Sequence, residues 1–453
     1  MFTDGVLYAA IAHNLALGLG TFWHPYFNET MFPFFHQQPP LTFGIQAVFF
    51  RIFGSSIYVE RIYSFGTLLL SAYLISCIWK IIFSDDERLK NISWLPIFLW
   101  IIFPICIWSY SNNMEENTMG IFALLSVLFA YKGLQENNSK SIFQIIFASI
   151  FASLAFLCKG FPGLFVLAFP FLFWLCFRTF SFRKMFLFSA LIFGSIAIIF
   201  TCLLLDANVR NSLLAYLNDR VINSVLHVST EQNRFYLIEK LFFVEMIPPV
   251  LFCLLIFGLL KWKSAFHKSQ IQQQKSKFLF FFLVGLAASI PLIVTKEQRE
   301  FYLVTSLPYF AIAFAISLSS GISELISRIK INSTGFKTAK FLAILFLVSS
   351  CIYSISEIGK TGRDKAELHD VYIFGKIIPP KTIVRVYTET NQNWGLHNYL
   401  VRYFNISMTD DTSNSYTYFL VEKKFKKTPS ARFSKIPLNT FQYDLYKRKD
   451  YKL

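Results

Sequence analysis

Apolar runs of about 20 residues, separated by short polar stretches, recur along most of the chain. A helix of that length crosses roughly 30 Å of hydrocarbon. The pattern therefore predicts an all-α polytopic membrane protein with about ten spans, at 58–79, 93–109, 117–132, 141–158, 162–178, 185–205, 241–260, 278–294, 301–320 and 338–357. The run Leu41–Phe53 is too short to span, and we expect it to pack at the membrane interface.

The connections between these runs differ in charge. The set 80–92, 132–140, 178–184, 261–277 and 321–340 carries roughly twice as many Lys and Arg as the opposite set, which is longer. Positively charged loops stay in the cytoplasm, so the loops 1–56 and 206–240 are expected outside, together with everything after about residue 358. Within the second outer loop, Leu213–His227 has helical spacing and is expected to lie along the interface.

The first 56 residues thus form an outer loop that no predicted span precedes. Met1–Asn14 lack the basic start and the long apolar core of a cleavable signal peptide. We expect that a first span precedes this loop in a longer reading frame, with Met1 an internal start. The alternative is a loop that later parts of the chain hold in place.

The composition changes after about residue 358. Thr382–Thr388 and Ser415–Glu422 are rich in Val, Tyr, Phe and Thr, which predicts strands, and Asn393–Phe404 reads as a short helix. We therefore expect two domains: a transmembrane domain over 1–357 and a small extracytoplasmic α/β domain over 358–453.

Composition supports the membrane interpretation. Hydrophobic residues make up 54% of the chain and charged residues 15%, whereas soluble domains carry about 25% charged residues. The net charge of +16 is spread over short loops instead of one basic stripe, which argues against a nucleic-acid partner. The seven cysteines lie inside or at the ends of apolar runs without zinc-ligand spacing, so we interpret them as small buried apolar residues.

Polar side chains that could take part in catalysis or binding gather on the outer side, whereas the cytoplasmic loops hold mostly Lys, Gln and Ser. A charge near the end of a span is costly unless it is paired or used. We therefore expect the functional site in this outer layer. Its candidates are Asp4, His36, Glu115, Glu116, Lys159, Arg234, Lys296, Arg299 and Tyr302.

Short motifs occur in a characteristic order from residue 1 to about 320: Asp4-Gly-Val-Leu-Tyr in the first loop, His36–Leu41 with Pro-Pro-Leu, Met114–Asn117 before a span, Leu157–Gly160 with Lys-Gly, and Lys296–Pro308. Each motif alone is weak, but their order is fairly specific. It resembles the GT-C superfamily of membrane glycosyltransferases, the group that contains protein O-mannosyltransferases and the aminoarabinose transferase of lipid A.

The resemblance implies a GT-C-like fold and a hexosyl- or pentosyltransferase that uses a polyprenyl-phosphate sugar, with inversion at the anomeric carbon. It implies that Asp4 activates the acceptor, which is a lipid, a glycan or a protein, since a hydroxyl is a poor nucleophile until a carboxylate accepts its proton. Cations should hold the leaving phosphate. The candidates are Lys159, Lys296, Arg299 and Arg234, with His36, Glu115, Glu116 and Tyr302 as further site residues.

Two departures bear on the chemistry. Many relatives have a second acid where this chain has Gly5, and many have an acid and a basic residue where it has Gln37 and Gln38. The missing acid before Pro39 argues against a divalent metal, and the sequence names no other cofactor. No nucleotide-binding glycine motif is present in the sequence.

Two other classes of function stay open. A transporter or lipid flippase would want ionisable residues near mid-membrane and broken helices, and few mid-span charges are found. A catalytically inactive GT-C relative is compatible with Gly5, Gln37 and Gln38. The expected location is the bacterial cytoplasmic membrane, with the site and the C-terminal domain facing outward. Sugar, acceptor and oligomeric state are not determined by the sequence.

Overall fold

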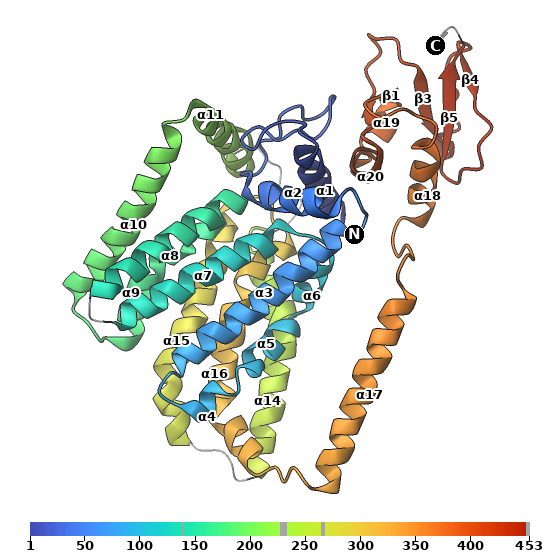
Figure 1. Cartoon of the computed structure of the whole chain (residues 1–453). Helices are drawn as coiled ribbons and strands as arrows, with labels where there is room; N and C mark the ends of the chain where they lie inside the picture. The colour runs from blue at the N-terminus through green and yellow to red at the C-terminus, as the bar shows by residue number, and fades with distance from the viewer. Residues whose placement is uncertain (137–138, 227–232, 264–267, 450–453) are drawn as a thin grey trace.

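The structure is a computed structural model that describes residues 1–136, 139–226, 233–263 and 268–449. Figure 1 shows a bundle of long helices, with a small sheet at the C-terminal end set to one side of the bundle's upper end. The chain is therefore mainly helical, as its hydrophobic pattern predicts.

Eight helical segments are long and apolar enough to cross a membrane, counted over the described residues. They contain α3 (Val59–Ile82), α7 (Glu115–Gln135), α8 (Ser139–Lys159), α10 (Phe182–Leu204), α13 (Tyr236–Lys240) with the π-helix η3 (Leu241–Glu245) and α14 (Ile247–Trp262), α15 (Lys268–Ser289) with the 3-10 helix η4 (Ile290–Val294), α16 (Leu307–Ser327) and α17 (Thr334–Ser356). Each coincides with one predicted span.

The two other predicted spans are interrupted, and both breaks lie at prolines. Helices α4 (Glu87–Lys90) and α5 (Trp94–Ile101) are followed by α6 (Pro104–Ser111) at a bend of 83°. The residue before a proline is pushed out of the helical region, and Phe103 is extended. The span predicted at 162–178 is a 3-10 helix, η1 (Phe161–Ala168), joined to α9 (Phe169–Phe177), where Pro162 and Pro170 lack the N–H group that a regular helix needs.

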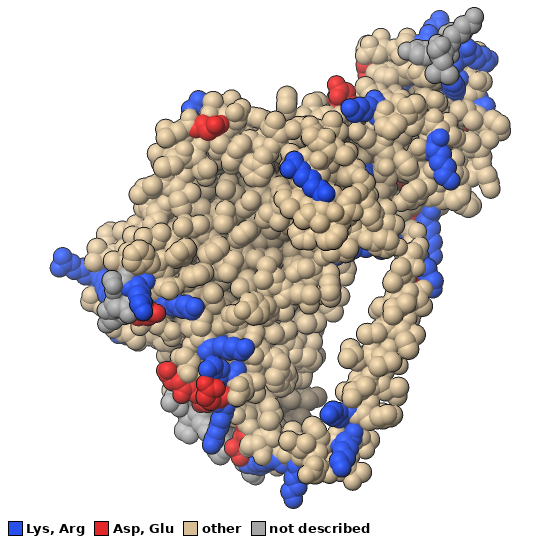
Figure 2. All heavy atoms as spheres, viewed as in Figure 1, with Lys and Arg blue, Asp and Glu red and all other residues tan. Residues whose placement is uncertain are grey.

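On the face that Figure 2 shows, charged side chains avoid a broad band of the surface. Lys and Arg gather at the lower end of this view, where α3, α14 and α16 end, and again on the C-terminal region. Charged groups are costly in hydrocarbon, so the band between them has the surface expected of a membrane-spanning body.

The prediction that all seven cysteines are buried is only partly right. Cys106, Cys158 and Cys253 are buried, but Cys202 on α10 and Cys351 on α17 are exposed. Both exposed residues lie on apolar spans, whose outer surface faces hydrocarbon, so exposure here needs no polar role.

The first 56 residues are more ordered than a loop. Helix α1 (Thr3–Ala16) is buried along most of its length, and α2 (Leu41–Phe53) is the short helix expected at the interface; both lie at the upper end of the bundle in Figure 1. Helices α11 (Ala207–Ala215), η2 (Tyr216–Ile222) and α12 (Asn223–Leu226) confirm the helix predicted from Leu213, although His227 lies outside the described residues.

The C-terminal region folds into a five-stranded sheet of order β2-β1-β3-β5-β4. Its strands are β1 (Ile383–Arg385), β2 (Ser407–Thr409), β3 (Tyr418–Glu422), β4 (Phe433–Lys435) and β5 (Tyr443–Arg448), with helices α18 (Lys365–Phe374), α19 (Thr388–Asn391) and α20 (Trp394–Phe404) and the short turn η6 (Lys423–Phe425). β1 pairs in parallel with β2 and β3, and β5 pairs antiparallel with β3 and β4. The predicted strands and helix are confirmed.

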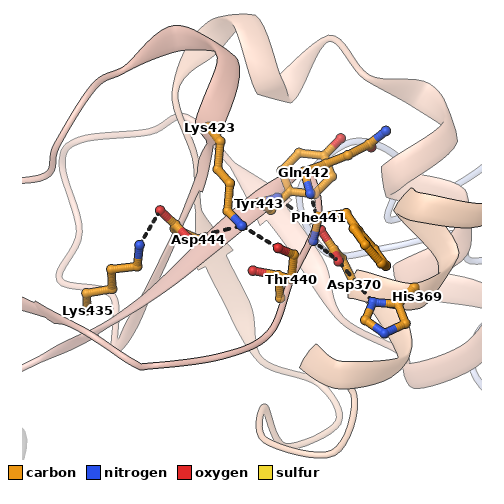
Figure 3. A network of polar contacts seen from close by, with 9 residues as sticks. All are labelled: His369, Asp370, Lys423, Lys435, Thr440, Phe441, Gln442, Tyr443 and Asp444. Atoms are coloured by element: carbon orange, nitrogen blue, oxygen red, sulfur yellow. Dashed lines mark hydrogen bonds and ion pairs between the residues drawn. The ribbon is translucent and has the colours of Figure 1, made fainter.

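The buried Asp370 carboxylate joins α18 to the start of β5 (Figure 3). Asp370 accepts hydrogen bonds from the backbone N–H groups of Phe441 (2.7 Å), Gln442 (2.7 Å) and Tyr443 (3.0 Å). Charge-assisted bonds of this kind are stronger than neutral ones. They explain how an aspartate tolerates full burial here, and they give it a structural role.

Helix α20 also joins the sheet region to the helical bundle. The Arg402 guanidinium pairs with the Glu60 carboxylate of α3 at 2.8 Å and donates to the Ser56 carbonyl oxygen at 3.0 Å. Both charged side chains are almost completely buried, with 1% and 2% exposure. A buried pair that is also hydrogen-bonded locks the two parts together, since neither charge tolerates losing its partner.

Helix α17 stands apart from the bundle. Figures 1 and 2 show it crossing the charge-free band alone, with open space between it and the body. In the described structure none of its residues is buried. It carries the chain from the lower end of the bundle to the sheet region at the upper end.

Replacing Arg402 with Met should destabilise the protein by about 3–5 kcal/mol, because Glu60 is left buried without a partner. The double variant Glu60→Met with Arg402→Met should lose less. Chemical unfolding in detergent measures this free energy. Lys360→Met is the control, since its pair with Glu357 is exposed and worth less than about 1 kcal/mol. Equal effects of Arg402→Met and Lys360→Met would contradict the assignment.

Candidate active site

Asp4 lies in the first turn of α1, and three asparagine side chains hold the backbone around it. Asn112 accepts a hydrogen bond from the Phe2 N–H at 2.6 Å, Asn113 donates to the Gly5 carbonyl oxygen at 3.0 Å, and Asn398 donates to the Thr3 carbonyl oxygen at 3.0 Å. Two come from the α6–α7 connection and one from α20. Segments far apart in sequence therefore fix the position of the acid.

The close approach of the α6–α7 connection explains Gly5. A Cβ atom at this position would lie 1.8 Å from the Asn112 carbonyl oxygen, far inside van der Waals contact. The second acid that many relatives carry here therefore does not fit in this chain. The departure seen in the sequence follows from how this chain packs α1.

A buried charge cluster lies where α7 begins and α8 ends. The Lys159 ammonium lies 2.8 Å from Glu116 Oε1 and 3.3 Å from Glu115 Oε2, and all three side chains are buried. The aromatic rings of Tyr8 and Tyr302 lie 5.7 Å and 5.3 Å from the same ammonium, within cation–π range. The two glutamates and the lysine predicted from separate motifs thus form one unit.

Asp4 belongs to the same electrostatic environment. Burial raises the pKa of the Asp4 carboxyl above its usual value, and the positive charges of Lys159 and Arg299 oppose this shift. Among the described residues, none forms an ion pair or a hydrogen bond with its carboxylate. The side chain is therefore available for a reacting group.

A cavity of about 260 Å³ opens beside the cluster. Its polar lining consists mainly of Gln38, Glu116, Lys159, Tyr216, Arg220 and Tyr302, and its apolar walls come from η1, η2 and η4, including Phe161, Val221, Pro291, Leu292 and Val294. Burial raises the pKa of Tyr302 to about 12, so this phenol stays protonated at neutral pH. The cavity thus combines an apolar wall with a charged end.

Arg220 is a lining residue that the sequence analysis missed. It lies in the π-helix η2 and pairs with Glu297 at 2.6 Å, with both side chains about one quarter exposed. The available signal was a cation inside the interfacial helix of the second outer loop. That signal was weak, because loop residues with the same charge are common.

The other cations that the sequence predicted for the site do not line this cavity. Lys296 donates to the Leu226 carbonyl oxygen at 3.0 Å and does not line it, and Arg234 is exposed. Arg299 lines a second cavity, described below. His36 contacts His24, with 3.0 Å between His24 Nδ1 and His36 Nε2, and burial lowers the pKa of His36.

The residues present do not fit a metal site. Over the described ranges, no group of three or more His, Cys, Asp or Glu side chains is arranged to hold a metal ion. The first loop brings together two histidines, and the acids near α7 already share Lys159. We therefore assign no step to a metal.

Fold and site together define a polytopic membrane protein with a polar cavity at the ends of its spans. Residues 37–204 match the family model described as dolichyl-phosphate-mannose-protein mannosyltransferase. No curated protein matches the chain by sequence.

Solved structures extend the likeness to nearly the whole chain. ArnT from Cupriavidus metallidurans bound to undecaprenyl phosphate is similar with a TM-score of 0.60 and 12% identity, covering 98% of this chain and 93% of that one. The oligosaccharyltransferase of Archaeoglobus fulgidus, in complex with Zn and sulfate, has a TM-score of 0.54 and 13% identity, covering 93% and 64%. The resemblance to the GT-C superfamily is confirmed: the chain has the fold of these membrane glycosyltransferases.

Gly5→Ala should distort the turn that carries Asp4, because the new methyl group meets backbone at 1.8 Å. Overpacking of this kind costs about 1–3 kcal/mol. Gly66→Ala is the control, since Gly66 lies in α3 with nothing within 4 Å, and alanine there should stabilise by about 0.5–1 kcal/mol. Thermal unfolding of both variants in detergent checks this. A Gly5→Ala protein as stable as wild type would contradict the close packing.

Proposed function

We propose that the chain transfers a sugar from a polyprenyl-phosphate carrier to a hydroxyl acceptor on the extracytoplasmic face of the membrane. One observation carries the proposal: the Asp4 carboxylate has no ion pair or hydrogen bond among the described residues, and it feels the charges of Lys159 and Arg220, which line a cavity with a charged end and an apolar wall. A lipid-linked phosphate likewise has a charged head and a long apolar chain, so its two parts match the two parts of the cavity.

The donor's phosphate fits the charged end of the cavity. Arg220 supplies a guanidinium, whose planar donors match phosphate oxygens, and the protonated Tyr302 hydroxyl supplies another donor. Arg220 pairs with the partly exposed Glu297, and it can turn to the singly charged phosphodiester of the donor and then to the more highly charged monophosphate that leaves. The prenyl chain would follow the apolar wall formed by Pro291, Leu292 and Val294.

For Lys159, which the sequence predicts as a phosphate ligand, we propose a structural task. Its ammonium is shared between Glu115 and Glu116, so it balances these carboxylates before any phosphate arrives. Glu116 lines the cavity, and its Oε2 atom has no hydrogen-bond partner among the described residues. Glu116 therefore keeps an unused acceptor position at the buried edge of the cavity.

Asp4 then acts as the general base. Its carboxylate accepts the proton of the acceptor hydroxyl while the oxygen attacks the anomeric carbon. The bond from that carbon to the phosphate oxygen breaks, and its electron pair leaves with the polyprenyl monophosphate. The charge that develops on this leaving group is stabilised by Arg220 and Tyr302. Direct displacement inverts the anomeric centre.

The loop charges support the proposed sidedness. The connections at the end of the bundle away from α1 hold most of the loop Lys and Arg, as cytoplasmic loops do. The cavity and the C-terminal sheet region then face outward. We accordingly propose that this is a protein of the bacterial cytoplasmic membrane with an extracytoplasmic C-terminal domain from about residue 358.

Asp4→Asn should lower the rate of sugar transfer by about 10²–10⁴-fold, because the amide cannot accept the proton. The assay uses the protein in liposomes with labelled polyprenyl-phosphate sugars and crude envelope acceptors. Asp206→Asn is the control, since Asp206 is exposed and caps α11, a task that asparagine performs equally well. Transfer that survives Asp4→Asn would refute the role of Asp4 as base.

The pH dependence of transfer should follow the raised pKa of Asp4. A base works only when deprotonated, so kcat should fall as pH drops through this pKa, at a higher pH than the value of about 3.9 for an ordinary aspartate. A pH–rate profile measured with saturating donor and acceptor checks this. An acidic limb at or below the ordinary value would contradict the buried position of the carboxyl.

A further inference from the structure

A second cavity, of about 440 Å³, lies on the other side of the segment that carries Tyr302. Its lining includes Phe2, Trp108, Tyr236, Glu245, Arg299 and Phe301. None of these residues lines the first cavity. The volume is within the range of about 300–1,000 Å³ that is usual for small-ligand sites.

Asp4 lines neither cavity, but it follows two residues after Phe2, which lines the second one. Phe301 faces the second cavity, while its neighbour Tyr302 faces the first. Asp4 responds electrostatically to Lys159, which lines the first cavity, and to Arg299, which lines the second. A general base needs the donor on one side and the acceptor hydroxyl within reach, so this placement is the one expected if the second cavity holds the acceptor.

Aromatic rings form much of the second cavity's wall. Trp108 stacks on Phe301 with ring centroids 5.8 Å apart and planes at 14°, and Phe2 meets Trp108 edge-on at 5.1 Å. Flat aromatic faces carry partial negative charge, which attracts the polarised C–H groups on the face of a sugar ring. Because the aromatic side chains already hold one another in place, they lose little conformational freedom when a sugar ring binds.

The polar groups of this cavity are few, and not all are available. Glu300 is occupied by the Tyr236 hydroxyl at 2.5 Å and the Lys240 ammonium at 2.8 Å. Glu245 uses Oε2 to accept the Ile105 N–H at 3.0 Å. The Arg299 guanidinium, in contrast, forms no ion pair or hydrogen bond within the described residues, and it is exposed. It is the cation that a bound hydroxyl or anionic substituent would meet.

We propose that the second cavity binds the acceptor, and that the acceptor is a saccharide whose ring packs against the Trp108 side chain, which Phe301 holds in place from behind, while Arg299 bonds its polar substituents. This assignment rests on the proposed glycosyl transfer. It separates the cations that the sequence grouped together: Arg220 serves the donor phosphate, and Arg299 serves the acceptor. A serine- or threonine-containing peptide is the competing acceptor, and aromatic stacking argues against it.

The test measures donor and acceptor constants separately in the liposome assay, with envelope oligosaccharide as acceptor. Arg299→Gln and Trp108→Ala should raise KM for the acceptor by about tenfold or more and leave KM for the donor within about twofold. Arg210→Gln, an exposed outer-loop cation away from both cavities, is the control and should change neither. Arg299 is exposed, so its variant should fold even where Trp108→Ala does not.

A second arm needs no turnover. A diazirine derivative of an N-acetylglucosamine disaccharide is photo-crosslinked to the full chain in detergent, and the labelled peptides are identified by mass spectrometry. Labels should fall within 104–108 and 298–301, and free disaccharide should compete for them.

The outcomes separate the two proposals. Transfer by wild type with a raised donor KM in Arg299→Gln would overturn the acceptor site but keep the glycosyltransferase. Labelling with no transfer from any polyprenyl-phosphate sugar would keep the saccharide site but overturn the transfer. Competition by a serine-rich peptide and not by the disaccharide, or labels elsewhere, would overturn the saccharide assignment.

Discussion

The ammonium group of Lys159, shared between Glu115 and Glu116, is the interaction on which the polar layer of this protein depends. Removing an ion from water costs several kcal/mol unless close partners replace the lost hydration. All three groups are buried at the ends of α7 and α8, so the two spans are tied together at this level. The cavity lies beside this tie, and both Lys159 and Glu116 line it.

A second buried ion pair fixes the C-terminal region to the helical bundle. Helix α20 brings a second buried pair, Arg402 with Glu60, and it also brings Asn398, which bonds the backbone beside Asp4. The sheet region is therefore more than an appendage that α17 carries to the upper end of the bundle. It supplies part of the scaffold that holds the first turn of α1.

The hydrophobic pattern predicts the elements whose placement depends mainly on moving apolar side chains from water into hydrocarbon. Spans such as α3 and α10 could be predicted because a run of about 20 consecutive apolar residues is typical of a transmembrane helix and rare elsewhere. The breaks at Pro104 and Pro162 were not foreseen, because hydropathy alone does not register a missing N–H group. Short strands in the tail were readable from their β-branched and aromatic residues.

The site was predictable only where motif order marked it. Asp4, Glu115, Glu116, Lys159 and Tyr302 were named from the sequence, and the structure brings them together. Arg220 was missed, and the sequence did not show that Lys159 and Arg299 line different cavities, because which wall a loop cation lines depends on tertiary packing. The sequence did not explain Gly5, because the atom that excludes a side chain there is a carbonyl oxygen from a distant connection.

We propose that the cavity beside Lys159 holds the phosphate of a polyprenyl carrier, and cryo-electron microscopy of the chain in nanodiscs with a polyprenyl monophosphate can locate that phosphate. We expect density for the phosphate within hydrogen-bond distance, about 2.7–3.2 Å, of the Arg220 guanidinium and the Tyr302 hydroxyl, with the prenyl chain against Leu292 and Val294. A phosphate bound instead at Lys296 and Arg234, or beside Arg299 in the second cavity, would contradict it.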